Sequence, residues 1–120
     1  MSVAAKAIAT LAALALLLVA PAAASASWGA IAIEPDSGKV GYARGLDTVV
    51  EAKEVALKEC GGGKCKVAVW VANGYGAVVK KKNGVYIAGL GRTKNLAFRD
   101  ARERAHEKAP AVAWVFSGLG

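Results

Sequence analysis

Residues 48–72, TVVEAKEVALKECGGGKCKVAVWVA, contain the signals of a helix, a tight loop and a strand in succession. Thr48 followed by Glu51 is a capping box, the arrangement that starts a helix. A stripe of small and apolar residues at helical spacing then marks the buried face: Val49, Ala52, Val55, Ala56 and Cys60. Lys66–Ala72 is largely apolar on both faces, which predicts a strand in a buried, central position. A helix beside such a strand indicates an α+β fold.

The segment before Thr48 predicts a β-hairpin. Ala30–Glu34 and Lys39–Ala43 flank the turn Pro35–Gly38, in which proline fixes one backbone angle and glycine permits a positive φ. The first part of the chain therefore predicts a unit of hairpin, helix and strand.

This unit recurs at an offset of roughly 45 residues. Three matches carry the repeat: Gly29–Ala32 with Gly76–Val79, Ala52 and Ala56 with Ala97 and Ala101, and Val69–Val71 with Ala113–Val115. The copies, about 28–72 and 75–117, predict a roughly six-stranded, mostly antiparallel sheet with two helices and a pseudo-twofold axis.

In the second copy, Asn83-Gly84 between Lys82 and Val85 predicts a two-residue hairpin turn. A helix is expected over residues 95–108, ended by Pro110, because the residue before a proline avoids helical angles. Residues 111–117 then form the last strand. Trp70 and Trp114 occupy matching strand positions and are predicted to lie in the core.

The first 26 residues are predicted to be a signal peptide. Lys6 is followed by an uncharged, leucine-rich run over 7–20, then Pro21 and a small-residue cleavage motif that ends at Ala26. The alternative is an uncleaved anchor, but a membrane span needs roughly 20 apolar residues. We therefore expect a single domain over 27–120, secreted or held in the periplasm or cell envelope, with no membrane span after cleavage.

The chain carries a net charge of +7. This charge favours an anionic partner, whether envelope polymer, lipid headgroup or acidic protein, and export argues against nucleic acid. The alternative is that the charge only keeps a small domain soluble.

Cys60 and Cys65 are the only cysteines. In an exported protein, two cysteines so close together predict a structural disulfide around the glycine-rich loop. Four intervening residues differ from the spacing of thiol oxidoreductases, and one distant histidine, His106, does not complete a zinc site. No metal and no cofactor are expected.

No catalytic residues are predicted. His106 lacks an identifiable nucleophile or orienting group, and a carboxylate pair among Glu34, Asp36 and Asp47 is formally possible but unsupported. The serines lack the context of a nucleophile elbow, and the G-x-G of residues 89–91 is weak evidence for phosphate binding.

Lys80, Lys81 and Lys82 are the strongest charge feature and the candidate contacts for an anionic partner. The alternative is that they protect an edge strand from aggregation.

Three segments resemble the bacterial secreted family called domain of unknown function 4189: Trp28–Ile33, Gly41-Tyr42 and Cys60–Trp70 with its Cys-Lys-Val-x-Val-Trp sequence. The resemblance implies a small exported protein with a repeated α+β unit, often disulfide-bonded, and supplies no established activity or catalytic residues. The chain departs from the family at Tyr75, near which relatives often have a further cysteine, and at Ala105, which matches Cys60.

These observations favour a non-enzymatic interaction module that binds a protein or an anionic envelope surface. One alternative is an inhibitor of a secreted hydrolase, with the turn Pro35–Gly38 as the inserted element. Another is a small enzyme that acts on the cell wall, which would need a cleft where His106 or carboxylates converge.

Overall fold

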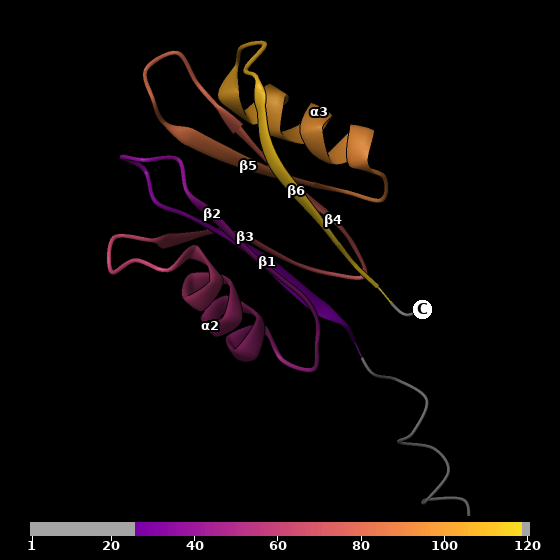
Figure 1. Ribbon diagram of the computed structural model, residues 1–120. Helices are drawn as coiled ribbons and strands as arrows, with labels where there is room; N and C mark the ends of the chain where they lie inside the picture. The colour runs from indigo at the N-terminus through magenta and orange to yellow at the C-terminus, as the bar shows by residue number, and fades with distance from the viewer. Residues whose placement is uncertain (1–25, 119–120) are drawn as a thin grey trace, which may run out of the picture.

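The computed structural model describes residues 26–118, which form six strands and two helices (Figure 1). The predicted signal peptide therefore lies, apart from Ala26, outside the described residues. The first half contains β1 (Trp28–Ile33), β2 (Val40–Leu46), α2 (Val49–Cys60) and β3 (Lys66–Ala72). The second half repeats this order with β4 (Gly74–Lys80), β5 (Tyr86–Gly91), α3 (Lys94–Ala105) and β6 (Ala111–Ser117).

The predicted α+β class, with six antiparallel strands and two helices, is confirmed, but the strands form two three-stranded sheets and not the one six-stranded sheet expected from the sequence. One sheet has the order β2-β1-β3 and the other β5-β4-β6, and all pairs are antiparallel. Asn73 alone separates β3 from β4, and its φ of 54° turns the chain from one sheet into the other. Asparagine tolerates this left-handed conformation better than most residues.

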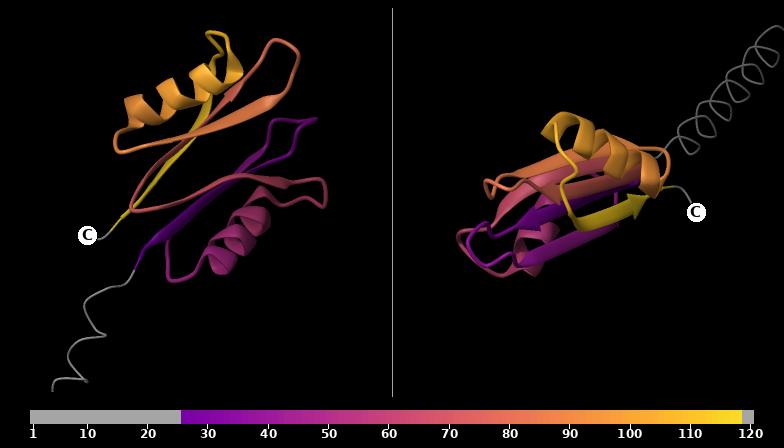
Figure 2. Two further views of the ribbon diagram at one scale, coloured as in Figure 1. Left: turned by 180° about the vertical axis from the view of Figure 1, so that it is seen from behind. Right: turned by 90° about the horizontal axis from the view of Figure 1, so that it is seen from above.

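The two sheets face each other, and one helix covers the outer face of each (Figures 1 and 2). The core between the sheets is built from branched residues, among them Ile31, Val69, Val78 and Val115. The cores under the helices are mostly alanine. Small side chains there let each helix lie close to its sheet.

Both helices begin at a threonine cap. The Glu51 amide donates to Thr48 Oγ1 at 3.1 Å, which confirms the N-cap half of the predicted capping box. The Glu51 carboxylate accepts from the Thr48 hydroxyl at 3.2 Å, where a full capping box would have it accept from the Thr48 amide. Thr93 caps α3 by accepting from the Leu96 amide at 3.1 Å.

The predicted end of the second helix is wrong. The helix ends at Ala105, and His106 takes a positive φ of 58° while its amide donates to the Glu103 carbonyl oxygen. Glycine usually fills this capping position. Because a histidine stands there instead, the sequence carries no glycine signal that would predict the end of the helix before Pro110.

The predicted two-residue turn in the second hairpin is also wrong. The Lys81 amide donates to the Val85 carbonyl oxygen at 2.8 Å, and the Gly84 amide donates to the Lys81 carbonyl oxygen at 2.9 Å. These bonds close a three-residue loop over 82–84, in which only Gly84 has a positive φ.

The predictions for β3 and the two tryptophans need correction as well. Strand β3 has the predicted bounds but is an edge strand, because β1 occupies the centre of the sheet. Trp70 is 47% exposed and Trp114 is 44% exposed, so neither is a core residue. Helix α2 packs mainly on β1 and β2, and α3 mainly on β4 and β5. Each helix thus leaves the outer face of the third strand, β3 or β6, largely uncovered.

Candidate binding surfaces

Four loops meet at one end of the molecule (Figure 1). They are the two hairpin loops, the loop inside the disulfide ring and the loop between α3 and β6. Two contacts connect them: Lys64 Nζ lies 4.0 Å from Asp36 Oδ2, and the Lys82 amide donates to Glu107 Oε2 at 3.0 Å. The two hairpins also lie close together, since a Cβ at Gly38 would be 3.7 Å from the Tyr86 hydroxyl. We call this surface the basic loop end, because lysines dominate it.

The predicted contact residues all lie at this end. Lys80 is the last residue of β4, while Lys81 and Lys82 begin the following loop. Since β4 is the central strand of its sheet, the edge-protection alternative for these lysines does not apply.

The backbone of this lysine run is fixed by two hydrogen bonds to the loop between α3 and β6. The Lys80 amide donates to the Pro110 carbonyl oxygen at 3.2 Å, and the Lys82 amide donates to Glu107. Lys80 and Lys82 have exposed side chains, and the Lys80 ammonium lies 5.4 Å from the centre of the Tyr86 ring. The side chains therefore project from a well-supported backbone.

Further lysines surround the run at the same end of the fold: Lys39, Lys64, Lys66 and Lys108. The acids on these loops are Glu34, Asp36 and Glu107. The Lys64–Asp36 pair is largely exposed, with side chains 78% and 81% accessible, so it stabilises the fold little. The loop end thus keeps an excess of positive charge.

An open groove of about 450 Å³ lies between the two hairpins at this end. Its walls are mostly apolar, with Ile33, Pro35 and Val67 on one side and Val85 and Tyr86 on the other. Lys66 also lines the groove, so a ligand here would meet apolar walls and one lysine side chain.

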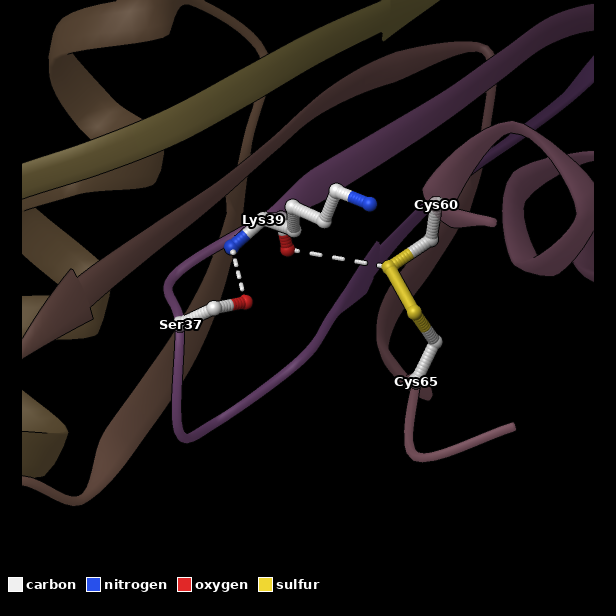
Figure 3. The surroundings of a disulfide bond; sticks show 4 residues. All are labelled: Ser37, Lys39, Cys60 and Cys65. Atoms are coloured by element: carbon white, nitrogen blue, oxygen red, sulfur yellow. Dashed lines mark hydrogen bonds between the residues drawn. A yellow bond between two sulfur atoms is a disulfide. The ribbon is translucent and has the colours of Figure 1, made fainter. Parts of the chain in front are cut away.

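The disulfide supports the first hairpin at the loop end. Cys60 and Cys65 are bonded, with their Cα atoms 6.3 Å apart, and Cys60 Sγ lies 3.6 Å from the Lys39 carbonyl oxygen (Figure 3). The Lys39 amide in turn donates to Ser37 Oγ at 3.2 Å. The disulfide ring and the hairpin therefore pack as one unit.

The residues considered for catalysis are divided between the two ends of the molecule. His106 is exposed at the end of α3, whereas Asp47 lies in the β2–α2 loop at the opposite end of the molecule from Glu34 and Asp36. Among residues 26–118, no group of three or more His, Cys, Asp or Glu side chains could hold a metal ion. Over the same residues, no helix is long and apolar enough to cross a membrane.

The G-x-G of residues 89–91 has a packing role. Gly89 and Gly91 belong to β5, and a Cβ at either position would overlap the backbone of α3. These glycines therefore let helix and strand touch.

Sequence reasoning missed two exposed aromatic sites. Lys53 Nζ lies 3.9 Å from the Trp70 ring centre, and Lys94 Nζ lies 4.9 Å from that of Trp114. Tyr75 packs beside Trp114 at 5.9 Å between ring centres. The matching positions of the tryptophans were visible in the sequence, but their exposure depends on which strands each helix covers.

Comparison with known proteins gives two matches. A family model described as a domain of unknown function (DUF4189) matches residues 28–113. The NMR structure of Rv1813c from Mycobacterium tuberculosis is similar at 36% identity and a TM-score of 0.58, over 75% of this chain and 74% of that one. No functionally curated protein gives a significant match.

Proposed function

The chain belongs to the family of the domain of unknown function 4189, and we propose that it is a non-enzymatic interaction module that binds an anionic partner through its basic loop end. The partner is an acidic protein or an anionic component of the cell envelope. The Cys60–Cys65 disulfide supports an oxidising location, which fits secretion, the periplasm or the envelope.

The observation that carries this proposal is the place of the lysine run. Lys80 ends the central strand β4, and the backbone of the run is held by Pro110 and Glu107. A run that only protected an edge strand would lie on β2, β3, β5 or β6. Lysines near an anionic surface contribute about 1 kcal/mol each, and salt screens this contribution.

A second candidate function is inhibition of a secreted hydrolase. The turn Pro35–Gly38 projects at the tip of the first hairpin, closed by the Gly38 amide to the Glu34 carbonyl oxygen at 2.8 Å and the Glu34 amide to the Lys39 carbonyl oxygen at 2.9 Å. The adjacent disulfide stiffens it, and a rigid exposed loop binds a cleft at low entropic cost. A cell-wall enzyme has less support, because Asp47 lies at the opposite end of the molecule from Glu34 and Asp36, and among residues 26–118 no ion pair joins His106 to a carboxylate.

The test is sedimentation with isolated cell envelope and with vesicles of phosphatidylglycerol and phosphatidylcholine, at low and physiological salt. The full chain, exported and purified with its disulfide formed, is compared with the Lys80→Ser, Lys81→Ser, Lys82→Ser variant. At about 1 kcal/mol per lysine, the variant should bind on the order of 100-fold more weakly.

The matched control removes the same charge from surfaces outside both the loop end and the groove beside β3, with Arg44→Ser, Lys94→Ser and Arg99→Ser. All three side chains are exposed. Equal loss in both variants would mean that only net charge matters, and unchanged binding in the lysine variant would exclude the loop end as the binding surface.

A further inference from the structure

Strand β3 has a free edge. It is the outer strand of its sheet, and among the described residues it pairs only with β1. The opposite side of an edge strand presents unpaired N–H and C=O groups in alternation, which are a template for another extended chain. Apart from Lys66 at its start, β3 carries no charged residue that would discourage such pairing.

A groove runs between β3 and β5, at the seam between the two sheets. It consists of two adjoining hollows of about 240 Å³ and 460 Å³, and Trp70 and Leu90 line both of them. Trp70 is 47% exposed and Leu90 is 48% exposed, although both are large apolar side chains. We call this feature the edge groove.

The charged side chains that line the edge groove are both arginines. Arg104 lines the smaller hollow and Arg92 the larger one, whereas no carboxylate lines either. Lys53 adds a further cation over the Trp70 ring. Arg104 is paired with Asp100, so the positive charge that favours an acidic ligand comes from Arg92 and Lys53, which form no ion pair among the described residues.

The neighbouring acid, Asp100, binds to the β5 side of the groove. Its Oδ2 accepts from the Leu90 amide at 2.9 Å and from Arg104 Nε at 3.1 Å. The carboxylate thus satisfies a main-chain donor of β5, so that edge is partly occupied. The edge of β3 is left as the open side of the groove.

We propose that the edge groove binds an extended acidic peptide, which adds to β3 as a further antiparallel or parallel strand. The main chain of the peptide pairs with β3, alternate apolar side chains pack on Trp70 and Leu90, and acidic side chains meet Arg92 and Arg104. A free strand edge beside a side-chain groove is the arrangement that recognises peptides by strand addition. The unpaired main chain of β3 favours a peptide over a polysaccharide, which cannot continue the sheet.

This site is separate from the lysine run at the basic loop end. It does not rest on the function proposed above, because Lys80, Lys81 and Lys82 do not line the edge groove. The two proposals therefore fail independently.

The test titrates the full chain with a labelled, end-blocked peptide of alternating glutamate and valine as long as β3. A peptide with glutamine in place of glutamate is the matched ligand. The glutamate peptide should bind at least about tenfold more tightly, and hydrogen exchange should show slower exchange of the amides over residues 67–71 when it is bound.

The internal repeat supplies a matched pair of tryptophan variants, one in the edge groove and one outside it. Trp70→Ala should weaken binding by about tenfold or more, whereas Trp114→Ala, at the matching position outside the groove, should leave it unchanged. Arg92→Glu changes an exposed side chain that packs in no core and should also weaken binding by about tenfold. The triple lysine-to-serine variant should still bind the peptide.

Equal affinity for the two peptides, equal loss in both tryptophan variants, or unchanged exchange over 67–71 would each overturn the proposal. Binding of polygalacturonic acid at this groove in place of the peptide, lost in Trp70→Ala, would overturn it in favour of a polysaccharide site.

Discussion

Gly41 on β2 lies directly against Ala56 on α2. A Cβ at position 41 would overlap the Ala56 carbonyl oxygen and would lie 2.8 Å from the Cys60 Cα atom. Gly89 on β5 stands in the same relation to Ala101 on α3, where a Cβ would lie 2.8 Å from the Ala101 Cα atom. Both halves of the molecule therefore seat the backbone of a helix on a glycine of the adjacent strand.

Gly41→Ala and Gly89→Ala should each lower the free energy of unfolding by about 3 kcal/mol, because backbone atoms cannot move aside as side chains can. Urea denaturation measures the loss. Gly63→Ala is the control, since nothing lies within 4 Å of a Cβ at that position and it should change stability little. A loss at Gly63 as large as at Gly41 would contradict the explanation.

Removal of the disulfide should cost about 2 kcal/mol, the loop-entropy value for so small a ring. Cys60→Ala with Cys65→Ala tests this, because Ala105 already fills the position that matches Cys60 in the other half. Chemical denaturation of the wild type with and without reductant should show the same difference. The double variant should not respond to reductant, and a response would point to an effect unrelated to the disulfide.

Thr48→Ala and Thr93→Ala should each destabilise the protein by about 1 kcal/mol through loss of a helix cap. The loss at Thr48 should be the larger, since its hydroxyl also donates to the Glu51 carboxylate, whereas Leu96 occupies that position in α3. Thermal unfolding measures both, with Thr48→Ser and Thr93→Ser as controls that keep the hydroxyl. Equal losses would show that the Glu51 carboxylate adds nothing.

Ser117→Ala should lower stability by about 1 kcal/mol. Ser117 is 2% exposed, and its Oγ accepts from the Gly45 amide at 3.1 Å and lies 2.9 Å from Ser27 Oγ. Denaturation of this variant should be compared with that of Ser37→Ala, whose hydroxyl is exposed and should matter little. If both variants match the wild type, the Ser117 bonds do not stabilise the fold.

Local signals predicted much of the fold. Thr48 and Glu51 marked the start of α2, the residues from Lys66 to Ala72 marked β3, and the repeat matched two units with the same order of elements. These features depend on side chains and backbone preferences within a few residues of each other, and such interactions are visible in sequence.

The errors concern features set by tertiary contacts. Asn73 divides the strands into two sheets by a single backbone angle, and His106 ends α3 in a conformation usually left to glycine. Trp70 is exposed because α2 lies on β1 and β2, and no pattern within β3 records where the helix packs. The edge groove arises where strands of different halves meet, so its residues are far apart in the sequence.

The one-residue connection at Asn73 also bears on how the two halves could diverge. A symmetric pair of identical subunits would carry every feature twice, and its stability would depend on concentration. Covalent fusion makes the pairing of halves unimolecular. It also allows a residue to change in one half without the same change in the other half. Only the first half keeps a disulfide and only the second has a lysine run, so the molecule presents different chemistry from two nearly equivalent scaffolds.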